Sequence, residues 1–279
     1  MTPVDVMSGD GPIVLGLPHT GTYVPPSVDF KLNKNGHELA DTDWNVDKLY
    51  EGLLPDASMV RANFHRYVID ANRDPSGVSL YPGQNTTGLC PTTDFDGLPI
   101  YQSGAEPNAD EVERRRLSFH APYHDALELE LKRVREIHGI AVLYDCHSIR
   151  SNIPFLYEGK LPDFNIGTNL GTTCDPGFEA ETLRICEDQT QFTHIVNGRF
   201  KGGWTTRHYG RPAENIHAIQ MELAQSTYME EIAPWKYSAE KAAIIRPVLK
   251  EILTVISSLA RSLKSQPSQN DIQQTEEIS

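Results

Sequence analysis

The sequence predicts an α/β fold with a largely parallel central sheet. Short apolar runs at residues 12–17 and 140–144 end abruptly in polar residues, as buried parallel strands with a site at their tips do. Helical periodicity is clearest over residues 106–138 and 238–263. The length of 279 residues is enough for one large α/β domain or two small ones.

The composition argues against nucleic-acid and membrane partners. The net charge of −13 does not suit a nucleic-acid surface, which needs a basic footprint. No segment approaches the roughly 20 apolar residues that span a bilayer, and the N-terminus lacks the positive region of a signal peptide. The four cysteines show no CxxC spacing, which makes a reducing cytoplasm the default location. An anionic small-molecule substrate would need a local cluster of Arg and Lys.

Residues 139–150 (GIAVLYDCHSIR) predict the central strand of the sheet. Open α/β sheets place their ligands at the carboxyl ends of parallel strands. At this end His147 can present a nitrogen to a metal, Asp145 can orient its ring, and Arg150 can hold an anion. The alternative for His147 is a buried histidine satisfied by a backbone carbonyl.

Residues 12–17 (PIVLGL) predict a second strand, which leads into His19 and a loop fixed by glycine and prolines. A helical spacing follows over residues 36–54. Three aspartates crowd its first half: Asp41, Asp43 and Asp47. They form a solvated acidic face at the start of a helix, or one of them turns inward to complete a metal site.

Two further strands are predicted over residues 57–62 and 65–71. The second ends in Asn72–Arg73, an amide and a guanidinium suited to clamping a carboxylate. A structural salt bridge is the competing interpretation of the arginine. Residues 75–105 are rich in Gly, Pro, Thr and Asn without a clear period, which predicts a loop that packs as a rim over the site.

The helical region over residues 106–138 contains His120 and His124, four residues apart. Two histidines at this spacing on a helix can bind a metal. However, Pro122 lies between them and the glutamate of an HExxH motif is missing. We therefore interpret both histidines as structural.

Beyond the central strand, residues 151–175 predict a polar loop, residues 176–191 a helix and residues 193–197 a strand. Residues 198–210 (GRFKGGWTTRHYG) then place basic and titratable groups among four glycines. In so acidic a protein, this cluster predicts an anion gate.

The last predicted strand, residues 215–223, delivers Glu222 near its end. This carboxylate is either a general base or a rim residue paired with an arginine. A helix over about residues 238–263 closes the domain, and the polar residues 265–279 predict a flexible, disordered tail.

Four predicted strands therefore end in residues suited to one site: His19, Asn72–Arg73, His147 and Glu222. A parallel sheet brings successive strand tips together. Two histidines and one carboxylate are the usual protein ligands of catalytic zinc, and a further carboxylate can deprotonate a water there. The absence of G-x-S-x-G, Walker A and G-x-G-x-x-G motifs argues against serine hydrolases, P-loop enzymes and dinucleotide binders.

Eight stretches carry a more specific resemblance: PHTGTYVP (18–25), DTDWNVDKLY (41–50), VIDANRDPSG (68–77), LYPGQNTTGLCPTT (80–93), LYDCHSIRSNIPFLYEG (143–159), LPDFNIGTN (161–169), GGWTTRHYG (202–210) and AIQMELAQ (218–225). They resemble the N-formylglutamate amidohydrolase (N-formylglutamate deformylase) family over nearly the whole chain except the polar tail. That family is similar in fold to zinc carboxypeptidases and aspartoacylases. The resemblance implies a single amidohydrolase domain over residues 1–264, with a mixed, largely parallel sheet between helices.

The resemblance also implies roles for the strand-end residues. By it, His19 and His147 are zinc ligands and Glu222 is the catalytic base. Asn72–Arg73 match the pair that binds the substrate carboxylate in the carboxypeptidase relatives.

The third metal ligand departs from the pattern of those relatives. They place a glutamate three residues after the first zinc histidine, where this chain has Thr22. The ligand must come from elsewhere, and Asp43 is the first choice with Asp41 second.

The implied reaction is hydrolysis of N-formyl-L-glutamate to formate and L-glutamate, a last step of histidine degradation. The cofactor is Zn²⁺ or another divalent transition metal. Arg73 and one of Arg150 or Arg207 would hold the two substrate carboxylates. The alternatives are an amidase for another N-acyl amino acid and a non-catalytic carboxylate-binding protein of the same fold. The oligomeric state stays open.

Overall fold

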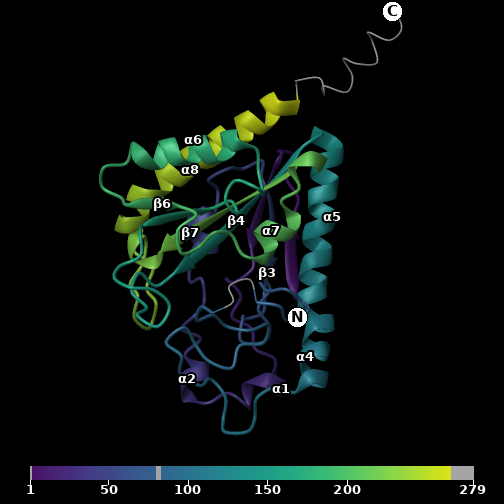
Figure 1. The fold of residues 1–279 in the computed structure, drawn as a ribbon, viewed down its shortest axis with the longest axis vertical. Coiled ribbons are helices and arrows are strands. Elements are labelled where there is room, and N and C mark those ends of the chain that lie inside the picture. Colours follow the sequence, from purple (N-terminus) through teal and green to yellow (C-terminus); the bar gives the residue numbers. More distant parts are fainter. Residues whose placement is uncertain (1, 80–82, 265–279) are drawn as a thin grey trace, which may run out of the picture.

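The computed structural model describes residues 2–79 and 83–264, so the predicted tail lies outside the described residues. In this part of the chain, seven strands form one sheet with helices on both faces (Figure 1), which confirms the predicted α/β class. The strands are β1 (Val4–Met7), β2 (Ile13–Leu17), β3 (Ser58–Ala62), β4 (Ala141–Ile149), β5 (Phe164–Gly167), β6 (His194–Val196) and β7 (Ile216–Ala224).

The sheet is mixed, with a parallel centre. Its strand order is β1-β3-β2-β4-β7-β5-β6. Strands β3, β2, β4 and β7 are parallel, whereas β1 pairs antiparallel with β3 and β5 pairs antiparallel with β7. Because β2, β4 and β7 are parallel neighbours, their carboxyl ends meet at one edge of the sheet.

The α-helices of the described residues are α1 (Pro26–Asp29), α2 (Lys34–His37), α3 (Val46–Tyr50), α4 (Ala109–Arg115), α5 (Ala121–His138), α6 (Pro176–Glu187), α7 (Trp204–Tyr209) and α8 (Ala239–Lys264). The longer helices lie on both sides of the sheet, whereas α1 and α2 lie among the loops below it (Figure 1). A π-helical turn, Arg116–His120, joins α4 to α5 into one long rod at the side of the sheet (Figure 1). On the opposite side α6 and α8 lie against each other (Figure 1).

Side chains of the central strands alternate between two hydrophobic cores, as the two-residue period of a strand requires. One core joins the sheet to α3, α6 and α8, and receives Val142, Tyr144 and Cys146 from β4. The other joins the sheet to α5, and receives Ala141 and Leu143. The same alternation places Asp145 and His147 of β4 on the α5 side, after Ala141 and Leu143. This face of β4 therefore changes from apolar to polar toward its carboxyl end.

Two predicted elements have a different structure. The helix expected over residues 36–54 is reduced to α3, because Asn45 takes a left-handed conformation with φ of 62° and the preceding residues form turns. The polar loop expected over residues 151–175 contains β5, a buried strand between β7 and β6 that is too short to show a period.

The strand predicted over residues 65–71 is wrong. This segment is buried but irregular, and it forms turns instead of a ladder. The amide of Asp70 donates to Leu89 O, and the carbonyls of Val68 and Ala71 accept from side chains of the long helical rod. Buried apolar residues in a short run do not distinguish a strand from a segment whose backbone is satisfied by side chains.

None of the helices in the described ranges is both long enough and apolar enough to cross a lipid bilayer.

Candidate metal centre and active site

The carboxyl-terminal halves of β4 and β7 form a polar grid on the α5 side of the sheet. In the register of these two strands, His147 lies opposite Glu222 and Asp145 lies opposite Gln220. All four side chains are buried. Gly203 N donates to Gln220 Oε1 at 2.7 Å, so the start of α7 closes over this grid.

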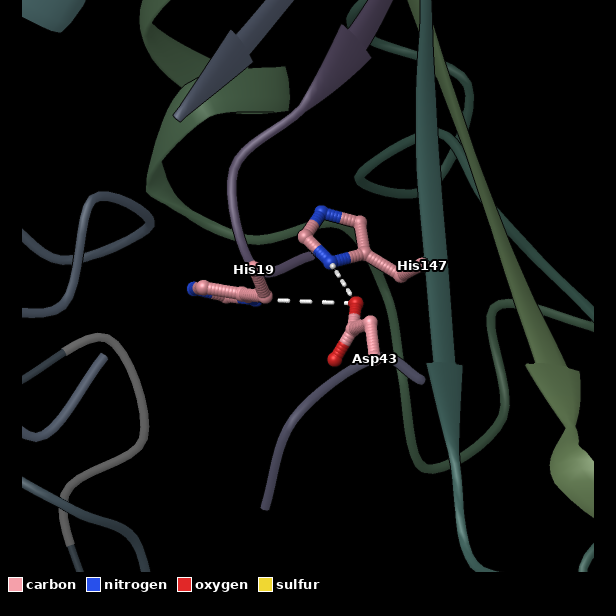
Figure 2. Close-up of side chains that lie close together, drawn as sticks. All are labelled: His19, Asp43 and His147. Carbon is pink, nitrogen blue, oxygen red and sulfur yellow. Dashed lines mark hydrogen bonds and ion pairs between the residues drawn. The ribbon is translucent and has the colours of Figure 1, made fainter. Parts of the chain in front are cut away.

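His19, Asp43 and His147 form a compact buried group among the described residues (Figure 2). One ligand atom from each lies within 4.8 Å of the other two. Asp43 Oδ2 is 3.2 Å from His147 Nδ1 and 3.7 Å from His19 Nδ1. His19 follows β2 and His147 lies in β4, so adjacent parallel strands bring the two rings together.

The remaining ring nitrogens face other carboxylates. His19 Nε2 is 2.7 Å from Asp70 Oδ1, and His147 Nε2 is 3.1 Å from Asp145 Oδ1. A carboxylate behind a histidine fixes the ring and its tautomer, which directs the Nδ1 lone pair toward a metal. His19 Nδ1 is buried without a hydrogen-bond partner. Two imidazoles, one carboxylate and an orphaned buried ring nitrogen fit a divalent transition metal such as zinc.

Of the two candidate aspartates, Asp43 lies with the histidines and Asp41 does not. Burial raises the pKa of Asp43, but the adjacent His147 and His19 rings outweigh burial and hold this pKa below its usual value. Asp41 instead accepts from Tyr67 Oη and Phe95 N, both at 2.9 Å. Burial raises the pKa of Asp41 to about 7, opposed by nearby arginines. An ionised carboxylate is the better cation ligand.

Glu222 lines the same pocket as the three residues of the metal-binding group. Burial raises its pKa to about 8, although the neighbouring His147 lowers it. Gln220 Nε2 donates to Glu222 Oε2 at 3.2 Å and orients the carboxyl group. A cation bound nearby shifts such a pKa downward. A carboxyl group with a pKa near neutrality can both take and return a proton.

The empty space in the pocket amounts to about 610 Å³, including the solvent at its open mouth. Three arginines line it: Arg66, Arg73 and Arg199. Arg66 is buried and pairs with Asp70 at 2.6 Å. Arg73 donates to Thr87 O at 2.9 Å.

Arg199 stands on the rim of the pocket. It donates through Nε to Leu156 O at 3.1 Å and through Nη2 to Asn85 O at 3.0 Å. Its guanidinium lies over the Phe200 ring, 5.5 Å from the ring centroid. Backbone carbonyls and an aromatic ring thus fix the orientation of a cation at the pocket.

A family model described as N-formylglutamate amidohydrolase matches residues 11–229. The chain belongs to this family. Two curated relatives are both named N-formylglutamate deformylase. The one from Pseudomonas aeruginosa is 44% identical over 91% of this chain and 95% of its own length. The one from Pseudomonas putida is 45% identical over 88% of this chain and 92% of its own length.

Two solved structures share the fold of this chain. The crystal structure of N-formylglutamate amidohydrolase from Ralstonia eutropha JMP134 has a TM-score of 0.78 at 26% identity, and covers 94% of this chain and 99% of that one. A protein from Agrobacterium tumefaciens shares the fold with a TM-score of 0.68 at 18% identity, over 93% of this chain and 96% of its own.

In this member of the amidohydrolase family, the predicted site residues divide into two sets. His19, Asp43, Asn72, Arg73, His147 and Glu222 all line the one pocket. Arg150 and Arg207 are not among its described lining residues. Arg150 pairs with Asp96 at 2.8 Å, and Arg207 Nε donates to Gly202 O at 2.8 Å.

The polar lining residues that the sequence did not indicate as site residues include Arg66, Arg199 and Gln220. Arg199 lies in the basic, glycine-rich segment 198–210, in which the sequence had indicated Arg207 instead. Gln220 lies two residues before Glu222 in β7, and the two-residue period of a strand could have identified it. Arg66 carried no sequence signal, because its segment was predicted as a regular strand.

Proposed function

We propose that this chain hydrolyses N-formyl-L-glutamate to formate and L-glutamate, using a zinc ion held by His19, Asp43 and His147. The proposal rests on one observation above all: a buried His-Asp-His group, a carboxyl group of near-neutral pKa and three guanidinium groups share one pocket. The names of the two Pseudomonas relatives support this substrate. We also propose a place in histidine degradation and a cytoplasmic location, which four cysteines without disulfides support.

In the proposed reaction, His19, Asp43 and His147 would hold a zinc ion that would supply Lewis-acid chemistry, polarising the formyl carbonyl and lowering the pKa of a nearby water. Glu222 accepts the proton of the attacking water as the water oxygen adds to the formyl carbon. The carbon–nitrogen bond then breaks, and Glu222 passes the proton to the leaving amine. Burial keeps bulk water away from this carboxyl group, so its proton is delivered to the amine.

Arg73 and Arg199 would hold the two carboxylates of the substrate. Asn72 and Arg73 lie beside the metal-binding group, where they suit the α-carboxylate. Arg199 lies on the rim, where a longer substrate arm ends. A guanidinium binds a carboxylate through two parallel hydrogen bonds, whereas a neutral amide cannot match this pattern.

The substrate preference can be tested by comparing formate release from N-formyl-L-glutamate and N-formyl-L-glutamine. We expect wild-type protein to release formate from N-formyl-L-glutamate far faster than from N-formyl-L-glutamine, and Arg199→Ala to remove most of this preference. An Arg199→Ala variant with the wild-type preference would assign the side-chain carboxylate to another cation. Acetyl- and succinyl-glutamate in the same assay distinguish a deformylase from an amidase for other N-acyl groups. A protein that binds these carboxylates without cleaving any of them would be a non-catalytic binding protein.

Arg73→Ala is expected to raise KM about 10- to 100-fold, because hydrogen bonds to a charged group contribute about 1.5–3 kcal/mol. The value of kcat should change less, since a clamp acts in the ground state and the transition state alike. Steady-state kinetics of formate release measure both constants. Arg184→Ala on the exposed face of α6 is the matched control. An unchanged KM with a collapsed kcat would place Arg73 at the reacting carbon.

A further inference from the structure

His120 and His124 contact the backbone that carries the proposed substrate clamp. His120 Nε2 lies 3.0 Å from Arg73 O, and His124 Nε2 lies 2.8 Å from Ala71 O. A carbonyl oxygen only accepts hydrogen bonds, so each Nε2 carries a proton and donates it. The two histidines therefore bind the chain on both sides of Asn72.

The π-helical turn between α4 and α5 explains how side chains of this continuous helical rod contact residues 67–73 at several points. In a π-helical turn the amide five residues ahead donates to the carbonyl, as Ala121 N does to Arg116 O. Residues five apart then share a face, and Arg115 and His120 both point at the segment from Tyr67 to Arg73. Arg115 Nη1 donates to Val68 O at 3.0 Å. One face of the rod supplies the donors that an irregular, buried segment needs.

Helix α7 connects the same histidines to the side chain of Asn72. Tyr209 Oη lies 3.1 Å from His124 Nδ1, and the Trp204 ring lies 4.7 Å from the His124 ring between centroids. At the start of this helix Thr205 N donates to Asn72 Oδ1 at 2.9 Å. The Asn72 amide nitrogen lies 3.2 Å from His147 Nε2. His120 and His124 thus hold the backbone on either side of Asn72, and α7, which packs against His124, holds its side chain.

We propose that His120 and His124 are positioning residues, which hold the backbone around Asn72 so that Asn72 and Arg73 meet the substrate carboxylate. The inference rests on the proposed function, because it assigns these histidines to the same substrate clamp. Burial lowers the pKa of both histidines, so each stays neutral with a single N–H directed at its carbonyl. Neither histidine belongs to the metal-binding group found in the described residues.

The test compares His120→Phe, which keeps a ring and removes the donor, with His120→Gln, which keeps an N–H donor. The Phe variant should raise KM for N-formyl-L-glutamate about tenfold, as expected when a buried acceptor loses its partner. Its kcat and metal content should stay close to wild type, and the Gln variant should restore KM. His208→Ala is the matched control, since this exposed histidine stacks on Trp204 at 4.3 Å between centroids in the same aromatic cluster.

A double-mutant cycle separates positioning from general stability. In the Arg73→Ala background, His120→Phe should raise KM by much less than in wild type, because the clamp is already lost. An equal increase in both backgrounds, or a wild-type KM in the Phe variant, would overturn the inference. Should His120→Phe fail to fold by circular dichroism, His124→Phe provides the same test through Ala71. Absence of formate release by wild-type protein would instead overturn the proposed function, and this inference with it.

Discussion

Glu222→Gln is expected to lower kcat for N-formyl-L-glutamate by about 10²–10⁴, the usual loss when a general base is removed. Glutamine keeps the size of the side chain and can still accept from Gln220 Nε2. It cannot take a proton from the attacking water. KM should stay nearly unchanged, because the arginines that line the pocket are intact. Steady-state kinetics with metal analysis of the same preparation measure the effect.

Metal content decides how the Glu222→Gln result is interpreted. A variant that keeps its metal and loses kcat supports a proton-transfer role. A variant that loses its metal shows Glu222 to be a ligand, and the roles of Asp43 and Glu222 would be exchanged. Full activity would place the general base elsewhere in the pocket. Glu128→Gln on α5, where Glu128 pairs with Lys132 at 2.8 Å, is the matched control.

Asp43→Ala is expected to remove both metal and activity. Asp43 Oδ2 lies between the two histidine rings, so this substitution removes one of the three proposed ligands (Figure 2). The affinity for the metal should fall more than roughly 10- to 100-fold, which is the usual effect of removing a residue that only hydrogen-bonds to a metal ligand. Metal content per chain after dialysis and formate release measure the outcome.

Asp41→Asn is the matched control for Asp43→Ala. The Asp41 carboxyl oxygen accepts from Tyr67 Oη and Phe95 N, and an asparagine oxygen can accept both bonds. We therefore expect this variant to keep its metal and most of its activity. Loss of metal from Asp41→Asn, with retention in Asp43→Ala, would reverse the choice of third ligand.

The central part of the fold was predictable because its strands are largely apolar and end in polar residues. The runs that became β2, β4 and β7 carry both signals, and their parallel pairing follows from the α/β pattern. His147 and Glu222 could be placed at one edge of the sheet for that reason. Their exact register, residue against residue, came only from the structure.

The rest of the site depends on contacts that leave no local pattern in the sequence. Asn72 and Arg73 were predicted at a strand end, but an irregular segment held by side chains of another element carries them. Arg199 reaches the pocket because backbone carbonyls of two distant loops orient it. Such long-range hydrogen bonds override local propensity, so periodicity cannot reveal them.

Titration of metal-free protein with zinc, followed by formate release from N-formyl-L-glutamate, tests the central claim most directly. Chelator-treated protein should keep its circular dichroism spectrum, because the two cores of the sheet do not include the metal-binding residues. We expect no formate without metal, and activity that rises with zinc and saturates at one ion per chain. Full activity in the metal-free protein would contradict the account, as would an absence of formate at every zinc concentration.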